Sequence, residues 1–158
     1  MKRPLLIIIV IFIIIMLALT AMILMNNSIS AQIAKENKEY EIYLGREISG
    51  TEVATLIGKV TDHNERNKVQ KDEKGIYIDN GENSIRIDIK MVTIEDIFPM
   101  EVISGNDIVA FIQNFNYIEF KCADIEYHEN TGRVSRIIFE EIAILEELDE
   151  PDEMEETE

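Results

Sequence analysis

The side chains best suited to covalent chemistry are few, because the chain has one cysteine and two histidines. Cys122 could act as a nucleophile if His63 or His128 took its proton. Cys122, however, lies in an alternating apolar segment typical of a strand, where a buried and inert cysteine is common. The histidines fall at the end of a predicted helix and in a predicted turn, so we expect both to be solvated. We predict no catalytic residue and no enzyme.

A second candidate is a metal site in the segment Asp79-Asn80-Gly81-Glu82-Asn83. Its oxygen-bearing side chains superficially resemble a calcium loop, but their spacing does not match the EF-hand pattern. The Asn-Gly pair is better explained as the tight turn of a hairpin, where both central residues need positive φ. The sequence has no His/Cys cluster for zinc and no glycine-rich phosphate loop. We therefore predict no metal and no cofactor.

The charge of the chain narrows its partners. The formal net charge is −16, all acidic residues follow Met25, and the stretch from Glu140 to the end holds eleven acidic residues and no basic one. So acidic a chain is repelled by phosphate backbones and anionic head groups, which argues against nucleic-acid binding. Solubility, divalent cations or a basic partner would explain the charge. One cysteine permits no disulfide within the chain.

The stretch Leu5–Met25 has twenty-one residues and no charge. A helix of that length spans about 30 Å, the thickness of a bilayer's hydrocarbon core. The alternative is a cleaved signal peptide, with Met1–Pro4 as its basic end and Ser28-Ile29-Ser30 as its site. The apolar run exceeds the roughly 7–15 residues usual for such peptides, so we predict an uncleaved single-pass membrane helix. Lys2 and Arg3 favour a cytoplasmic N-terminus and an extracytoplasmic C-terminal domain.

The rest of the chain divides by composition. We predict a cytoplasmic N-terminus (1–4), a transmembrane helix (5–25), a stalk or linker with helical character (26–39), an acidic α+β domain (40–147) and a disordered acidic tail (148–158).

Two amphipathic helices are predicted in the α+β domain. The first begins at a capping box formed by Ser49 and Glu52. The second begins near Ser104. Each carries one apolar stripe at helical spacing, formed by Val53, Leu56, Ile57 and Val60 in the first and by Ile108, Phe111, Ile112 and Phe115 in the second.

Antiparallel hairpins are predicted between and after these helices. The first joins 76–79 to 84–91, with Ile85, Ile87, Ile89 and Met91 buried and Arg86, Asp88 and Lys90 solvated. The second joins 117–127 to 133–139 through a turn at 128–132, with a bulge near Cys122-Ala123. A strand at 40–44 offers an exposed edge for a partner. Residues 92–102 form a connection with an edge strand, and 140–148 continues the last strand or forms a short helix.

The two helices also suggest an internal repeat. Ile48-Ser49-Gly50 recurs as Ile103-Ser104-Gly105 at an offset of 55, and the two apolar stripes match at the same offset. We hypothesise two copies of a strand–helix–hairpin unit.

One N-terminal helix carrying a small α+β head resembles the layout of type IV pilins and pseudopilins. The prepilin mark of that family, a small residue before a Phe with a Glu five residues into the apolar run, is missing here. The expected function is a non-catalytic accessory or interaction component of a bacterial envelope assembly with an unidentified protein partner. The alternatives are a pilin-like subunit or a ligand-binding sensor with an apolar pocket lined by both amphipathic helices.

Overall fold

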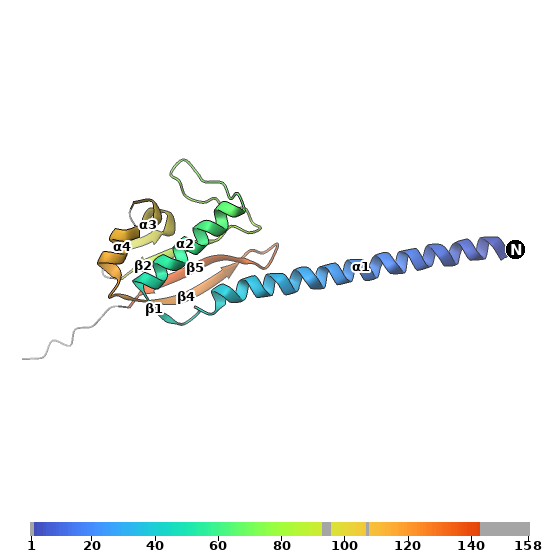
Figure 1. The fold of residues 1–158 in the computed structure, drawn as a ribbon, viewed down its shortest axis with the longest axis horizontal. Coiled ribbons are helices and arrows are strands. Elements are labelled where there is room, and N and C mark those ends of the chain that lie inside the picture. Colours follow the sequence, from blue (N-terminus) through green and yellow to red (C-terminus); the bar gives the residue numbers. More distant parts are fainter. Residues whose placement is uncertain (1, 93–95, 107, 143–158) are drawn as a thin grey trace, which may run out of the picture.

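The computed structural model describes residues 2–92, 96–106 and 108–142, and it shows an α+β head on a long N-terminal helix (Figure 1). The elements in chain order are α1 (Lys2–Glu41), β1 (Glu47–Ser49), α2 (Gly50–Arg66), β2 (Arg86–Met91), β3 (Asp96–Pro99), α3 (Met100–Asn106), α4 (Ile108–Phe115), β4 (Glu119–Tyr127) and β5 (Val134–Glu141).

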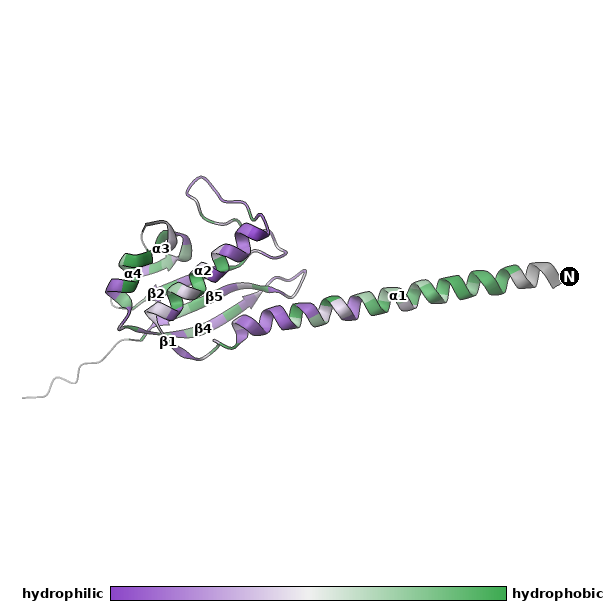
Figure 2. Cartoon of the chain, viewed as in Figure 1, coloured by the Kyte–Doolittle hydropathy of each residue, from purple (hydrophilic) through white to green (hydrophobic). Residues whose placement is uncertain are grey.

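Helix α1 continues without a break from the apolar run into the head, so the segment 26–39 is helical as expected. Its length is about 60 Å at about 1.5 Å per residue. Figure 2 shows the change from hydrophobic to hydrophilic residues along it. The most apolar part packs against nothing in the head, and it is long enough to cross a membrane, although a signal sequence would have the same properties.

The predicted strand at 40–44 is wrong, because Tyr40 and Glu41 form the last turn of α1. A turn follows directly: Tyr43 N–H donates to the Tyr40 carbonyl at 3.0 Å and Leu44 N–H to the Glu41 carbonyl at 3.1 Å. Tyr40 packs into the core of the head. The apolar residues that looked like a strand therefore belong to a helix end that docks on the head.

The head contains one mixed five-stranded sheet in the order β1-β4-β5-β2-β3, in which β2 and β5 are parallel and the other neighbours antiparallel. The second predicted hairpin is confirmed as β4–β5, with its register shift between Cys122 and Asp124. The expected edge strand is β3. Strand β5 extends to Glu141, so the beginning of the predicted segment 140–148 continues the last strand. The remainder of that segment after Ile142 and the predicted tail 148–158 lie outside the described residues.

The first predicted hairpin is wrong, because 76–79 forms no strand beside β2. The Asn80 side chain competes for the backbone there: its Oδ1 accepts the N–H groups of Glu82, Asn83 and Ser84, each at 3.0 Å. This Asx-type closure folds the segment into a compact loop. Strand β2 is therefore free to pair with β5 and β3.

The helices α2, α3 and α4 cover one face of the sheet (Figure 1). The capping box at Ser49 and the buried apolar stripe of α2 are confirmed. The core lies between these helices and the alternating residues Ile87, Ile89, Phe120, Ile137 and Phe139 of the sheet. In this two-layer arrangement, none of the described helices covers the other face of the sheet.

Charged residues from four neighbouring strands form a row across the open face. In register, Glu47 faces Lys121, Lys121 faces Glu140, and Glu140 faces Lys90, with a 2.7 Å ion pair between the last two. Asp88 departs from the predicted solvated face, because it is buried against the Arg136 guanidinium. The face thus satisfies most of its charges within itself.

The proposed repeat is not confirmed. Ser49 precedes α2 as a cap at the end of β1, whereas Ser104 lies inside α3. Residues 102–104, which the offset of 55 sets against β1, are therefore helical, and β2 pairs with the following strand β3 and not with 76–79. The shared Ile-Ser-Gly tripeptide stands in two different backbone environments.

Candidate functional site

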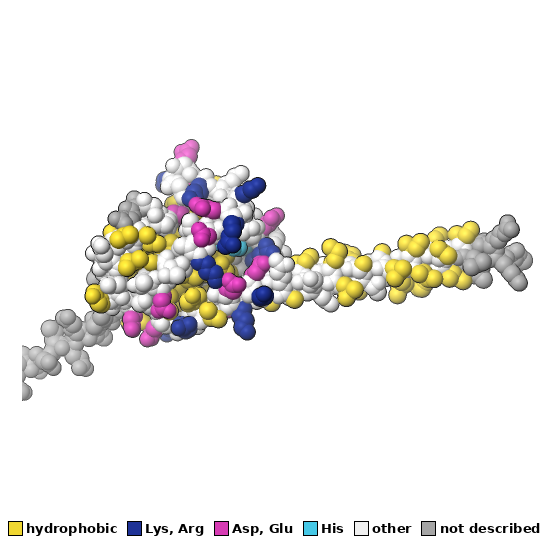
Figure 3. All heavy atoms as spheres, viewed as in Figure 1, with side chains coloured by type: hydrophobic (Ala, Val, Ile, Leu, Met, Phe, Trp, Pro, Cys, Tyr) yellow, Lys and Arg dark blue, Asp and Glu magenta, His cyan; other side chains and the backbone are white. Residues whose placement is uncertain are grey.

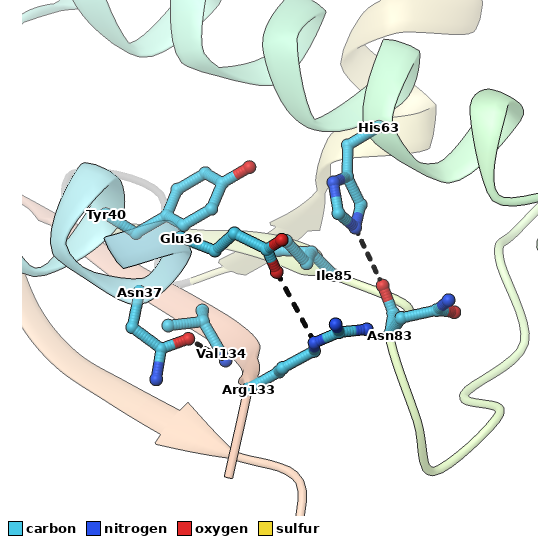
Figure 4. A pocket seen from close by; sticks show the side chains of 8 residues that line it. All are labelled: Glu36, Asn37, Tyr40, His63, Asn83, Ile85, Arg133 and Val134. Carbon is cyan, nitrogen blue, oxygen red and sulfur yellow. Dashed lines mark hydrogen bonds and ion pairs between the residues drawn. The ribbon is translucent and has the colours of Figure 1, made fainter. Parts of the chain in front are cut away.

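A recess lies where the end of α1 meets the second half of α2 (Figure 4). An open groove of about 410 Å³ leads into a small cavity of about 20 Å³. Both are lined by Glu36, Tyr40, His63 and Arg133. Gln32, Glu39, Lys59, Arg66 and Asn67 line the groove alone, and Asn37, Asn83, Ile85 and Val134 line the cavity.

Two asparagine side chains connect the helices beside the recess to the sheet. The Asn37 amide donates to the Gly132 carbonyl at 2.7 Å and accepts the Val134 N–H at 3.0 Å. The Asn64 amide likewise donates to the Ile85 carbonyl at 2.7 Å and accepts the Ile85 N–H at 2.9 Å. Val134 begins β5 and Ile85 directly precedes β2, so each side chain substitutes for a strand partner at the start of the two parallel strands. This pairing joins α1 and α2 to the sheet.

Tyr40 contributes a buried phenol to the recess. Its side chain is 5% exposed, and Lys59 Nζ lies 5.2 Å from the ring centroid. The hydroxyl points into the recess and has no hydrogen-bond partner among the described residues (Figure 4). Burial, helped by the charge of Glu39, raises the pKa of Tyr40 to about 12. The phenol therefore keeps its proton at neutral pH and can donate it in a hydrogen bond.

His63 faces Tyr40 from the opposite wall of the recess (Figure 4). Its Nε2 lies 2.9 Å from the Asn83 carbonyl oxygen, which accepts, and 3.2 Å from the Asn67 amide nitrogen, which donates. Nδ1 has no partner among the residues that the structure describes and is available to a ligand. The half-buried His63 thus differs from the solvated residue that the sequence suggested.

Cationic side chains surround the groove. Lys59 Nζ pairs with Glu39 at 2.8 Å, which holds the pKa of that carboxyl below its usual range. Arg133 Nε lies 3.4 Å from Glu36, but without hydrogen-bond geometry, so this buried N–H is unsatisfied. With Arg66 the groove has three cations and two carboxylates. Its local charge is therefore positive in a strongly acidic chain.

The residues first considered for covalent chemistry are not brought together. Cys122 is buried in β4, its Sγ donates to the Asp124 carbonyl at 3.8 Å, and burial raises the pKa of its thiol to about 11. No described interaction joins it to a histidine. His128 is 4% exposed rather than solvated, with Nε2 2.7 Å from the Ser84 carbonyl oxygen.

The acidic loop after Tyr77 is closed by its own hydrogen bonds. Asp79 Oδ1 accepts the Gly81 N–H at 2.8 Å and the Ser84 hydroxyl at 3.0 Å, which lowers the pKa of that carboxyl. Within the described ranges, no three His, Cys, Asp or Glu side chains are arranged to hold a metal ion. The loop thus acts as a structural turn.

The recess escaped sequence reasoning because its residues come from segments far apart in the chain. A signal was present: Lys59, His63 and Arg66 lie on one face of α2 at helical spacing. The other wall was hidden, since Tyr40 was assigned to a strand. The sensor alternative required an apolar pocket lined by both amphipathic helices. The groove is mainly polar and the small cavity below it mainly apolar, and α4 lines neither of them.

The fold and the recess define a small α+β head on an apolar helix. The chain matches no family model, no curated protein and no solved structure in the comparisons. Its function must therefore be argued from its own geometry.

Proposed function

We propose that this chain is a single-pass membrane protein that displays a non-catalytic interaction domain outside a bacterial cytoplasmic membrane. Helix α1 is the anchor, and residues 1–4 lie in the cytoplasm. The observation that carries the proposal is the exposed apolar half of α1, which packs against no part of the described head. In water such a surface would be strongly unfavourable, whereas lipid accommodates it.

The junction between α1 and the head is continuous. The helix passes through Ser28-Ile29-Ser30, where a signal peptide would be cut, and ends docked on the head. The Asn37 pairing and the Tyr127 hydroxyl, which donates to Glu41 at 2.9 Å, hold that end. These contacts lie after the cut site, so the length of the apolar run supports the uncleaved anchor and the docked end gives it a fixed direction from the head.

The anchor is tested by fractionation and by the N-terminus of the mature protein. We expect the intact chain, beginning at or near Met1, in membranes washed with alkaline carbonate. A soluble polypeptide beginning near Ala31 would refute the anchor. For orientation, protease added to intact cells should remove a tag placed after Glu158; removal only after lysis would reverse the topology.

The surface best suited to a protein partner is the distal patch, defined here as Ile97, Val102, Val109 and Tyr117. These side chains are exposed, Tyr117 by 86%, and they lie on or beside β3, α3 and α4. Those elements form the end of the head away from the start of α1 (Figures 1 and 3). The stretch 91–120 contains no Lys or Arg but several acidic residues.

This charge pattern indicates which kind of partner would bind the distal patch. An apolar centre within acidic surroundings fits a protein with an apolar contact surface and a basic rim. A second copy of this chain would bring its own acidic residues against the first, so it fits poorly. The pilin-like alternative requires copies of the chain to assemble and is disfavoured for the same reason.

Site-specific photo-crosslinking tests the patch in cells. A crosslinking amino acid at Tyr117 should give one discrete product with a different protein, and the same group at Ile42, exposed outside the patch, should not. The captured protein, once purified, should bind the head, and Val109→Lys should abolish binding. A self-crosslink or a product that Val109→Lys leaves unchanged would refute this assignment.

A further inference from the structure

We propose that the recess between α1 and α2 is a binding site for a phosphate group, supplied either by a membrane lipid or by a free phosphate ester. The groups that converge there are hydrogen-bond donors and cations without complete partners. They come from three elements: the end of α1, the second half of α2, and the residue before β5.

Two unsatisfied donors carry the inference. Tyr40 is 5% exposed, its hydroxyl points into the recess, and no described residue accepts its hydrogen. The Nε–H of Arg133 is buried in the same wall and makes only the 3.4 Å ion pair to Glu36, whereas the Tyr40 hydroxyl is not among the fully buried unpaired atoms and can reach solvent. An acceptor that enters the recess would therefore meet one buried donor and one accessible donor side by side.

The surrounding charges identify the acceptor as an anion. Lys59, Arg66 and Arg133 line the groove against Glu36 and Glu39, which leaves one positive charge in excess. An arginine guanidinium and a lysine ammonium bind phosphate oxygens through charge-assisted hydrogen bonds. The neutral phenol of Tyr40 adds a donor that needs no compensating charge. A ligand with several anionic oxygens satisfies all of these groups.

The position along α1 places the recess beyond the lipid head groups when the helix stands upright. Gln32, at the edge of the groove, lies seven residues beyond Met25, or about 10 Å along the helix, and Tyr40 lies about 22 Å beyond Met25, so a lipid phosphate reaches the recess only where the helix leans and the head lies against the membrane. The head-group layer extends about 5–7 Å beyond the hydrocarbon core. The whole chain is acidic and is repelled from anionic surfaces, so the site would act through local contacts and not through the net charge.

The two histidines provide a test inside one molecule. The full chain is labelled with ¹³C-histidine and its imidazole signals are followed by NMR; His63 lines the recess and His128 does not. Inorganic phosphate is added to the protein in neutral detergent, up to about 10 mM, which would fill a site with a Kd of about 1 mM. In a second arm the protein is placed in nanodiscs of phosphatidylcholine with or without phosphatidylglycerol.

We expect a saturable shift of the His63 signal while the His128 signal stays in place. A response to inorganic phosphate assigns the site to free phosphate esters, and a response to phosphatidylglycerol alone assigns it to a lipid head group. Arg133→Gln should weaken binding about tenfold. Tyr40→Phe should weaken it without lowering the melting temperature, because its hydroxyl has no partner in the free protein.

Lys121→Gln is the matched control, since it removes one positive charge from the open face of the sheet. The proposal is overturned if His63 responds in neither arm, if both histidines shift together, or if Lys121→Gln weakens binding as much as Arg133→Gln does.

Discussion

The pairing of Asn37 with the start of β5 predicts a large effect from one substitution. Asn37→Ala removes a 2.7 Å hydrogen bond to the Gly132 carbonyl and a 3.0 Å hydrogen bond from the Val134 N–H. Asn37 is 8% exposed and Val134 2%, so water does not readily replace the lost partners. The substitution therefore breaks the main polar link between α1 and the sheet.

The expected loss can be worked from these contacts. The exposed Gly132 carbonyl loses a hydrogen bond worth about 1 kcal/mol net, and the buried Val134 N–H left unpaired costs about 1–3 kcal/mol. We therefore expect Asn37→Ala to lower the free energy of unfolding by about 2–4 kcal/mol. For a head of this size each kcal/mol corresponds to roughly 4 °C, so the melting temperature should fall by about 8–16 °C.

Circular dichroism of the full chain in neutral detergent measures the melting temperature, and hydrogen exchange measures protection of the Val134 amide. Asn27→Ala is the control, because Asn27 is an exposed asparagine of the same helix. The reasoning is refuted if Asn37→Ala melts with the control, or if the Val134 amide stays as protected as in the unmodified chain.

Three further predictions concern single residues of the head. Gly50→Ala places a Cβ 2.1 Å from the Phe115 carbonyl oxygen and should cost about 3 kcal/mol, whereas Gly58→Ala in the same helix meets no atom and should stabilise by about 0.5–1 kcal/mol; chemical denaturation compares them. Cys122, with its raised pKa of about 11, should react with a thiol reagent at pH 8 only as fast as the head unfolds, and rapid labelling of the folded protein would contradict its burial. The pKa of Asp79 is lowered in the folded state, so the stability contributed by its carboxylate is complete above the unfolded pKa of about 3.9 and is lost as pH falls through the folded pKa. The melting temperature of Asp79→Asn should therefore change less between pH 5 and 3 than that of the unmodified chain. An equal change in both proteins would exclude a stabilising role for the Asp79 carboxylate.

Local patterns in the sequence predicted those elements whose physical causes are also local. The capping box at Ser49 and the apolar stripe of α2 depend on residues within a few positions of one another. The same holds for the β4–β5 turn and for the shift of alternation at Cys122. These features could be predicted without knowing which strands are neighbours.

The errors arose where a distant partner or a side chain decided the outcome. Nothing local indicates that β2 pairs in parallel with β5, about fifty residues away. Asn80 used its side chain to close a loop where the sequence suggested a hairpin. Tyr40 looked like a strand residue until its docking on the head was visible. The recess could not be predicted for the same reasons, because the order of the strands decides which residues line it.

Because α1 is one continuous helix, any tilt of its apolar half displaces the head. From Met25 to Tyr40 the axis rises about 22 Å. If α1 is anchored in a membrane as proposed, a lean of about 20°, a common tilt for such helices, moves the docked end sideways by about 8 Å. Because the Asn37 pairing leaves little freedom at the joint, the head must follow that movement as a rigid load. A protein that changed the tilt of the anchored helix would therefore also change the direction in which the head faces.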